Sequence, residues 1–349
     1  MPGLTTIQDQ LSQGTRPSIL SRNIKFNASS SQPSVILQPT GKYAFAKSLT
    51  KLNDESQLSL KWKKSKSVGP GLINMGNTCY LNSILQCLTY TPPLAQYLMA
   101  HPHDCHSKSS CTLSAMEDHV KRSLGGSNEA SFCPKSILSK LKWISKTLKF
   151  GRQEDSHEFM LYLLQSMQRS CAGKKKPTAS GIVHDVFGGS IQSQVKCLVC
   201  KTESNTIDPV QDLCLEIKHC DSIEKALAFY TKSELLSGEN RYRCQKCVFA
   251  SCTHYEFRCK KLVDAQKRMT VNDLPAVLSI QLKRFDFFKL NGSKINRPVQ
   301  FGETLDMGPY LSKKEVCAIL ILTQHFQKGM NYKLYAVLVH AGFSCNSGM

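Results

Sequence analysis

The stretch that decides the fold is Gly71-Leu72-Ile73-Asn74-Met75-Gly76-Asn77-Thr78-Cys79-Tyr80. Its glycines allow a tight turn, and Asn77 or Thr78 can cap a helix that follows. Apolar residues then recur at helical spacing until Pro92 and Pro93 interrupt them, namely Leu81, Ile84, Leu85 and Leu88. The sequence therefore predicts a tight loop that leads into a helix with Cys79 in its first turn.

Cys79 is the candidate nucleophile. Free N–H groups and the dipole at a helix start favour a thiolate over a thiol, and the thiolate is the nucleophilic form. The side-chain amide of Asn74 can donate a hydrogen bond to the oxyanion that forms when a carbonyl is attacked, a contribution of roughly 3–4 kcal/mol in comparable sites. Cys87 lies further along the same predicted helix and is expected to be a buried, inert thiol.

The rest of the chain predicts an α+β fold. A second helix is expected from about Asp155, because Phe159, Leu163 and Met167 share one helical face. After about residue 180 the pattern changes to short strands separated by turn residues, and the clearest strands are residues 276–282 and 334–339. Helices followed by sheet are typical of the α+β class.

These segments resemble the signatures of the ubiquitin-specific proteases, peptidase family C19. Residues 76–82 with Gln86-Cys87-Leu88 resemble the cysteine box of that family, and Gln153-Glu154-Asp155-Ser156-His157-Glu158-Phe159 resembles its second signature. Residues 274–285 resemble its later strand signature, and residues 335–342 resemble the approach to its histidine box. Residues 87–94 are most similar to the nucleolar branch that contains ubiquitin carboxyl-terminal hydrolase 36.

The resemblance implies a papain-like cysteine protease over residues 68–349, with a helical thumb, an antiparallel-sheet palm and zinc-type fingers. The implied activity is thiol-dependent hydrolysis of the isopeptide bond at the C-terminal glycine of ubiquitin, and the implied partners are ubiquitin and ubiquitinated proteins. A ubiquitin tail that runs Arg-Leu-Arg-Gly-Gly needs an acidic contact, and Asp155 matches the position of the family's acid. Asp155 can instead be only a helix cap. Phe285 and Phe301 are further substrate-binding candidates, or core residues.

The resemblance also implies a general-base histidine in a Gly-His-Tyr context shortly after His340. Met349 stands at that position, so no general base is assigned in this sequence, and His340 resembles the first, non-catalytic histidine of the box. We expect that the sequence lacks the C-terminal strands of the domain. Two hypotheses follow: a deubiquitinase with Cys79 as its nucleophile, or a ubiquitin-binding product whose catalysis is impaired.

Two C-x-x-C pairs predict a metal site, Cys197 with Cys200 and Cys244 with Cys247. Each pair can hold one edge of a tetrahedral Zn²⁺, with thiolates about 2.3 Å from the metal. Such a metal would fasten hairpin tips that have little core of their own. Four thiolates leave no open position, so the zinc would be structural, and no catalytic cofactor is implied. A redox dithiol is the alternative.

The composition indicates a reducing compartment and a basic surface. Sixteen cysteines in a 349-residue chain without a recognisable export signal are expected to be reduced. No apolar run approaches the about 20 residues of a membrane span, so no membrane partner is expected. The net charge of +19 favours polyanionic partners such as nucleic acid, ribosomes or chromatin, although solubility alone explains it equally well.

Residues 1–67 are polar and Ser-rich, with no sustained helical or strand period, and are predicted to form a disordered basic arm. The short basic cluster at residues 61–66 is either a nuclear address or a chance occurrence. The charge and the branch resemblance together lead us to expect a nuclear and specifically nucleolar protein, with the cytoplasm as the alternative.

Overall fold

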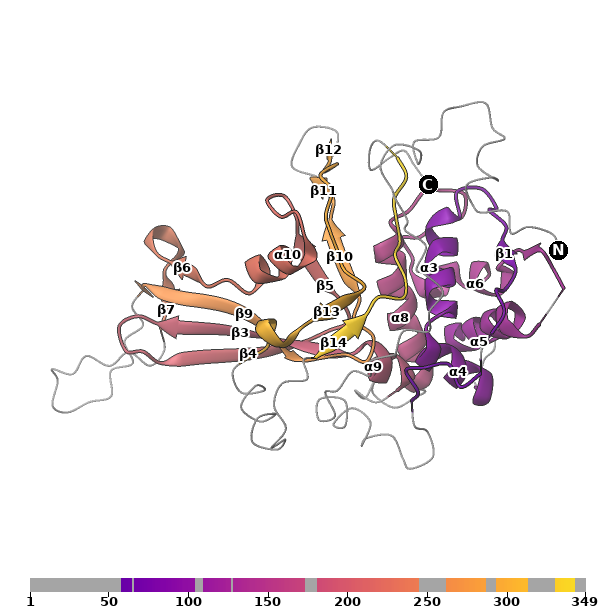
Figure 1. Ribbon diagram of the computed structural model, residues 1–349, viewed down its shortest axis with the longest axis horizontal. Coiled ribbons are helices and arrows are strands. Elements are labelled where there is room, and N and C mark those ends of the chain that lie inside the picture. The colour runs from indigo at the N-terminus through magenta and orange to yellow at the C-terminus, as the bar shows by residue number, and fades with distance from the viewer. Residues whose placement is uncertain are drawn as a thin grey trace.

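The computed structural model describes residues 58–64, 66–103, 109–126, 128–172, 181–244, 262–286, 293–312 and 330–342. A helical part and a strand-rich part lie side by side along the long axis of the molecule (Figure 1). We call the helices and short strands of residues 71–187 the thumb. The four-stranded sheet and the hairpin beyond it, described below, are the fingers, and the strands and helix between the fingers and the thumb are the palm.

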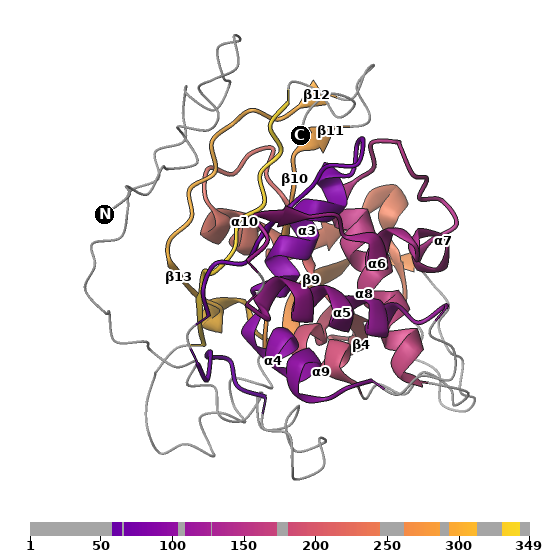
Figure 2. The same ribbon diagram turned by 90° about the vertical axis from the view of Figure 1, so that its right-hand side faces the viewer.

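The thumb is organised around helix α3 (Cys79–Thr89), which packs against helix α8 (Ser156–Ala172). The other helices of the thumb are α4 (Pro92–Ala100), α5 (Thr112–Leu124), α6 (Lys135–Leu138), α7 (Leu141–Ile144) and α9 (Ile182–Phe187). Strands β1 (Gly71–Leu72) and β2 (Ser131–Phe132) pair in parallel beside them. Figure 2 shows these helices gathered on one side of the molecule.

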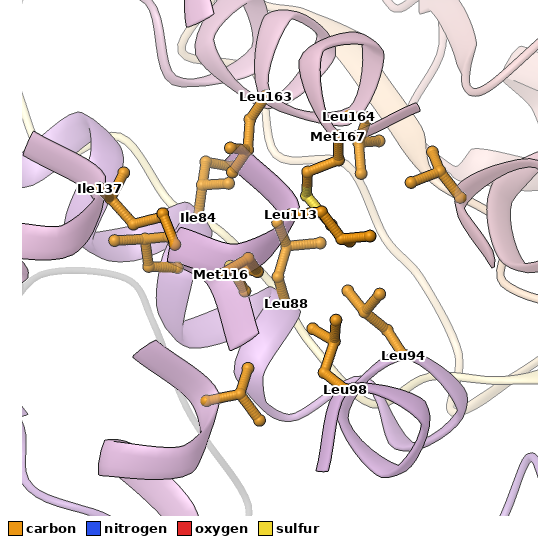
Figure 3. Packing of buried hydrophobic residues seen from close by; sticks show 14 of the residues in the cluster. Ile84, Leu88, Leu94, Leu98, Leu113, Met116, Ile137, Leu163, Leu164 and Met167 are labelled. Carbon is orange, nitrogen blue, oxygen red and sulfur yellow. The ribbon is translucent and has the colours of Figure 1, made fainter. Parts of the chain in front are cut away.

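The predicted apolar faces of α3 and α8 form the centre of the thumb core. Leu81, Leu85, Phe159, Leu163 and Met167 have no exposed surface, which confirms both helices and the faces predicted for them. Figure 3 shows side chains from α3, α4, α5, α6 and α8 pointing toward one another around this core. Full burial of one such side chain contributes roughly 1.5–3 kcal/mol relative to leaving it exposed, so the core fixes the start of α3 and the start of α8 relative to each other.

The fingers extend away from the thumb as a four-stranded antiparallel sheet of order β4-β3-β9-β6 (Figure 1). Its strands are β3 (Gly189–Cys197), β4 (Glu203–Val210), β6 (Glu234–Leu236) and β9 (Ala265–Asp273). The hairpin of β7 (Tyr242–Arg243) and β8 (Leu262–Val263) lies at the end far from the thumb.

The palm lies between the fingers and the thumb and has its own buried core, which includes Leu213, Leu215, Met307 and Tyr310. Its elements are β5 (Leu213–Glu216), α10 (Ile223–Tyr230), β10 (Ile280–Lys283), β11 (Phe285–Asp286), β12 (Ser293–Lys294), β13 (Thr304–Asp306) and β14 (Asn331–Lys333). Strands β11 and β12 pair antiparallel, as do β13 and β14. Strands β5 and β10 are parallel, contrary to the antiparallel palm predicted, and the long excursion through α10 and the fingers supplies the crossover that a parallel pair requires.

Two predicted strands differ from the structure. In the segment 276–282 the strand begins only at Ile280, because Val277 instead donates its N–H to the Val186 carbonyl (2.8 Å) and is buried with the thumb core. The strand predicted at residues 334–339 is wrong, since β14 ends at Lys333 and residues 334–342 form no strand. At this edge the Leu334 N–H donates to the Glu303 carbonyl (2.8 Å).

The folded domain begins before residue 67, the boundary predicted for the disordered arm. Leu58 and Trp62 pack against the thumb core, and the Gln96 side chain donates to the carbonyls of Ser59 and Lys61. The apolar side chain of Trp62 explains this attachment, because burying it removes a large surface from water. Within the described ranges, no helix combines the length and the apolar composition needed to cross a membrane.

Candidate active site

The loop before α3 is closed by hydrogen bonds between its own residues. The Thr78 N–H and hydroxyl both donate to Asn74 Oδ1 (3.0 and 3.1 Å), and the Met75 N–H donates to Thr78 Oγ1 (2.9 Å). Gly76 (φ 85°) and Asn77 (φ 55°) both adopt left-handed backbone angles. Thr78 is the residue before the first helical turn, but its hydroxyl bonds within the loop and not to a helix N–H.

This closure orients the Asn74 amide. Its oxygen is occupied by Thr78, so the donor that the side chain offers to any other group is its NH₂. The loop is also held from outside, because Asn77 Nδ2 donates to the Gly151 carbonyl (2.9 Å). Cys79 follows as the first residue of α3 and is half-buried. Cys79, predicted as the nucleophile, and Asn74, predicted as the oxyanion donor, therefore belong to one loop that is held by hydrogen bonds, here called the tied loop.

The starts of α3 and α8 lie next to each other. The Tyr80 and Phe159 rings meet edge to face with centroids 5.4 Å apart, and each residue lies in the first turn of its helix. The first turns of the two helices therefore lie close together, and the positive end of each helix dipole favours a developing negative charge there. Burial, then the negative charges of Glu154 and Cys79, raises the pKa of Tyr80 to about 12. Tyr80 thus stays neutral, and Glu154 is an acid near Tyr80 that sequence reasoning had not singled out.

Asp155 caps α8. Its Oδ1 accepts hydrogen bonds from the N–H groups of His157 (2.7 Å) and Glu158 (3.0 Å), which confirms the helix-cap interpretation. The residue is exposed, and its second carboxylate oxygen is left for another partner. Contact with a substrate stays a prediction.

Other candidate residues lie on the palm, near the start of α8. The Phe285 ring contacts the His340 ring edge to face at 5.1 Å. Burial and then Lys294 lower the pKa of His340, against the opposing charge of Asp155. Phe285 and His340 therefore contact each other on the palm, and Asp155 of the thumb is close enough to act on His340 electrostatically. Phe301 is 48% exposed and follows Gln300, which bridges to Ser222 at the start of α10, so it belongs to the palm surface near α10.

No general base can be assigned from the geometry. Within the ranges that the structure describes, no histidine forms a hydrogen bond with Cys79, and Met349 lies outside those ranges. His340 contacts Phe285, and its assignment as a non-catalytic histidine stays a prediction. Cys87 is half-buried instead of fully buried as predicted, and burial raises the pKa of its thiol.

Three cysteines gather at the end of the fingers, as predicted for a metal site. The thiols of Cys197, Cys200 and Cys244 lie within 4.8 Å of one another, and Cys200 Sγ is 3.7 Å from Cys244 Sγ. Two thiolates at tetrahedral angles and about 2.3 Å from a zinc ion lie about 3.8 Å apart. The Cys200 N–H also donates to Cys197 Sγ (3.4 Å). These residues fit a zinc ion, and Cys247, the predicted fourth ligand, lies outside the described residues.

Comparison with known proteins decides the family. The family model described as "Ubiquitin carboxyl-terminal hydrolase" matches residues 70–349. The chain belongs to this family of cysteine proteases. Human ubiquitin carboxyl-terminal hydrolase 42 is 40% identical over 84% of this chain and 21% of that protein. The probable ubiquitin carboxyl-terminal hydrolase 16 of Schizosaccharomyces pombe is 38% identical over 84% of this chain and 61% of that protein.

A solved relative confirms the papain-like α+β fold of this ubiquitin carboxyl-terminal hydrolase. The SAGA DUB module containing Ubp8, bound to monoubiquitin, matches with a TM-score of 0.64 and 29% identity over 87% of this chain and 64% of that chain. The chain spans between about one fifth and two thirds of the relatives named here.

Sequence reasoning missed one contact that joins thumb to palm. His157 Nε2 lies 2.8 Å from Asp212 Oδ2, and the Cys214 thiol donates to the same carboxylate oxygen (3.1 Å). The hydrogen bond that His157 donates to the Asp212 carboxylate raises the pKa of His157, although burial opposes the shift. Burial raises the pKa of Cys214 to about 11, with Asp212 adding to the effect. The only sequence signal is the alternation of polar and apolar residues from Asp212 to Leu215.

The left-handed backbone at Gly76 generates a first prediction. Gly76→Ala should lower the free energy of unfolding by about 1–2 kcal/mol and slow the alkylation of Cys79, because the loop that orients the thiol is strained. Gly126→Ala is a matched control, since Gly126 has the same φ of 85° and equally open surroundings.

Gly126→Ala should cost similar stability without changing Cys79. The measurements are urea unfolding and the rate of iodoacetamide modification at Cys79, followed by mass spectrometry. Equal alkylation rates at Cys79 in the two variants would contradict the role given to the loop.

Proposed function

We propose that this chain is a thiol-dependent deubiquitinase that hydrolyses the isopeptide bond at the C-terminal glycine of ubiquitin. The observation that carries the proposal is the tied loop that presents Cys79 and the Asn74 amide at the adjoining starts of α3 and α8, in a chain of the ubiquitin carboxyl-terminal hydrolase family. A solved relative is bound to monoubiquitin, which supports ubiquitin as the partner.

In the proposed reaction, the Cys79 thiolate attacks the carbonyl carbon of the terminal glycine. The negative charge that develops on the carbonyl oxygen receives a hydrogen bond from the Asn74 NH₂ and faces the helix-start N–H groups. Collapse of this intermediate releases the lysine amine, which takes up a proton, and leaves a thioester on Cys79 that water then hydrolyses. The proposal assigns the proton transfers to no histidine among the described residues.

The acidic residues Glu154, Asp155 and Glu158, here called the acidic rim, suit the basic tail of ubiquitin. Glu154 lies near Tyr80, and Asp155 and Glu158 follow it at the start of α8, where both are exposed. The two arginines of the tail are the groups that such carboxylates attract, and pairs between guanidinium and carboxylate are strong charge-assisted hydrogen bonds. Phe285 and Phe301 are proposed as apolar contacts for the same substrate.

The test is release of a fluorophore from the C-terminus of ubiquitin by the 349-residue protein. Cys79→Ala should abolish turnover, and Asn74→Ala should lower kcat by about 10²–10³-fold. Cys133→Ser should behave as the unmodified protein. Ubiquitin binding without turnover above the Cys79→Ala blank would instead support the second hypothesis, a ubiquitin-binding protein with impaired catalysis.

Asp155 can be tested for substrate contact separately from capping. Asparagine caps helices as well as aspartate, so Asp155→Asn should change the free energy of unfolding by no more than about 0.5 kcal/mol. Loss of the charge should raise KM for ubiquitin substrates roughly tenfold, since a neutral acceptor binds arginine about half as strongly. Asp155→Ala should lose both the helix cap and the substrate contact, so that the free energy of unfolding falls and KM rises. A KM that stays the same in Asp155→Asn would leave Asp155 with the capping role only.

We further propose a structural zinc ion in the fingers, held by Cys197, Cys200, Cys244 and Cys247. The near-tetrahedral spacing of the described thiols supports it. Dialysed protein should retain one zinc ion per chain, and Cys200→Ser should lose it and unfold at lower temperature, whereas Cys133→Ser should keep it. Elemental analysis and thermal unfolding measure both quantities. A zinc content that Cys200→Ser does not reduce would exclude this site.

A polyanion-binding role is a second proposal, supported by one face of the thumb. Residues 130–153 contain no Asp or Glu, and their exposed cations are Lys135, Lys142, Lys146, Lys149 and Arg152. Trp143 and Phe150 lie among them, 49% and 61% exposed. Within the described chain these cations form no ion pair. Exposed aromatic rings among cations suit single-stranded nucleic acid, whose bases stack on them.

Charge reversal tests this role. Changing Lys142, Lys146 and Lys149 to Glu should weaken binding of a single-stranded oligonucleotide at least tenfold and flatten its salt dependence. The matched control changes Lys218, Lys232 and Lys333 to Glu, which gives the same net charge elsewhere. Equal loss in both variants would show a nonspecific effect of net charge. We also propose a nuclear, nucleolar location, supported by the net charge of +19 and by the similarity of residues 87–94 to the nucleolar branch.

A further inference from the structure

A second group of metal-binding side chains lies where the thumb meets the palm. His157 is in the first turn of α8, and Asp212 and Cys214 lie at the start of β5. Alternate residues of a strand point to the same face. Leu213 and Leu215 point into the palm core, so Asp212 and Cys214 point toward α8.

The geometry of this group is close to that of a metal site. Its imidazole nitrogen, carboxylate oxygen and sulfur lie within 4.8 Å of one another. The side chains of His157 and Asp212 keep 20% and 12% of their surface exposed, so an ion can reach them. Nitrogen, carboxylate oxygen and thiolate sulfur are the three ligand types that zinc uses in proteins.

We propose that His157, Asp212 and Cys214 bind a zinc ion that is distinct from the zinc of the fingers. The ion replaces the two hydrogen bonds to Asp212 by bonds to Nε2, a carboxylate oxygen and Sγ. The neutral imidazole of His157 then carries its hydrogen on Nδ1 instead of Nε2, and the thiol proton of Cys214 passes to solvent. Three protein ligands leave a fourth position open to water. The site is therefore expected to be weaker and more exchangeable than one closed by four cysteines.

The effect on activity rests on the proposed function. His157 lies two residues after Asp155, and Asp155, Glu158 and Asp212 all act on it electrostatically. Zinc adds two positive charges and removes one proton, so it makes this end of α8 less attractive to the arginines of a ubiquitin tail. Zinc should therefore raise KM for ubiquitin substrates and leave kcat nearly unchanged.

A purely structural role for the three side chains gives different results. In that case the group is a hydrogen-bonded tie between α8 and β5, and a serine hydroxyl at position 214 can donate to Asp212 as the thiol does. Cys214→Ser therefore preserves the tie and removes the soft metal ligand. Cys133→Ser is the matched control, because Cys133 is a half-buried cysteine of the thumb outside both sites.

Cobalt binding to the zinc-loaded full chain tests the site directly. After dialysis leaves zinc only in the fingers, added Co²⁺ should produce thiolate-to-cobalt charge-transfer absorption with one further equivalent bound. Cys214→Ser should weaken this binding at least tenfold and remove the charge-transfer band, and Cys133→Ser should not. His157→Gln, which keeps a hydrogen-bond donor, serves as a second variant. Cobalt binding that is the same in Cys214→Ser and the unmodified protein would overturn the proposal.

Steady-state kinetics separate this inference from the proposed function. Added Zn²⁺ should raise KM roughly three- to tenfold in the unmodified protein, the effect of one net charge at partly screened range, and should not change KM in Cys214→Ser. Absence of turnover together with cobalt binding would count against the proposed function alone. Normal turnover without cobalt binding would overturn the metal site alone.

Discussion

Helix α3 packs against helix α8 through side chains that are fully removed from water, and the position of every candidate catalytic residue depends on this contact. Leu81 and Leu85 of α3 and Phe159 and Leu163 of α8 have no exposed surface. The edge-to-face contact of Tyr80 with Phe159 sets the two helix starts side by side. Cys79 begins one helix and Asp155 caps the other. The packing that stabilises the thumb therefore also brings the candidate nucleophile and the acidic rim together.

The palm and the fingers depend on other interactions. The palm has a separate buried core, and the described finger tip buries little more than Cys197 and Cys244 with partly buried Tyr242 and Val263. A tip with so few apolar contacts needs an additional link, which the proposed zinc ion would supply. The palm meets the thumb through His157 and Asp212 beside the acidic rim. The thumb therefore positions the candidate nucleophile Cys79 and the acidic rim, and the palm contributes Phe285 and His340 beside them.

Local sequence patterns predicted the thumb well because its contacts repeat at helical spacing. The α3 and α8 faces, the tight loop with Gly76 and the pairing of Cys197 with Cys200 all depend on residues close in sequence. The parallel pairing of β5 with β10 and the His157–Asp212 contact, 55 residues apart, depend on how the chain returns after long excursions. The strand predicted at residues 334–339 from their β propensity also depends on a distant partner. Within the described residues, the pairing of this edge with β13 ends with β14.

We propose that Cys79, alone among the sixteen cysteines, reacts with the end of a ubiquitin tail. The most direct test of this proposal is reaction of the 349-residue protein with ubiquitin that carries a thiol-reactive electrophile in place of its terminal carboxylate, followed by peptide mass spectrometry. We expect one covalent adduct, located on Cys79. An adduct on another cysteine, or no adduct from folded protein, would contradict it.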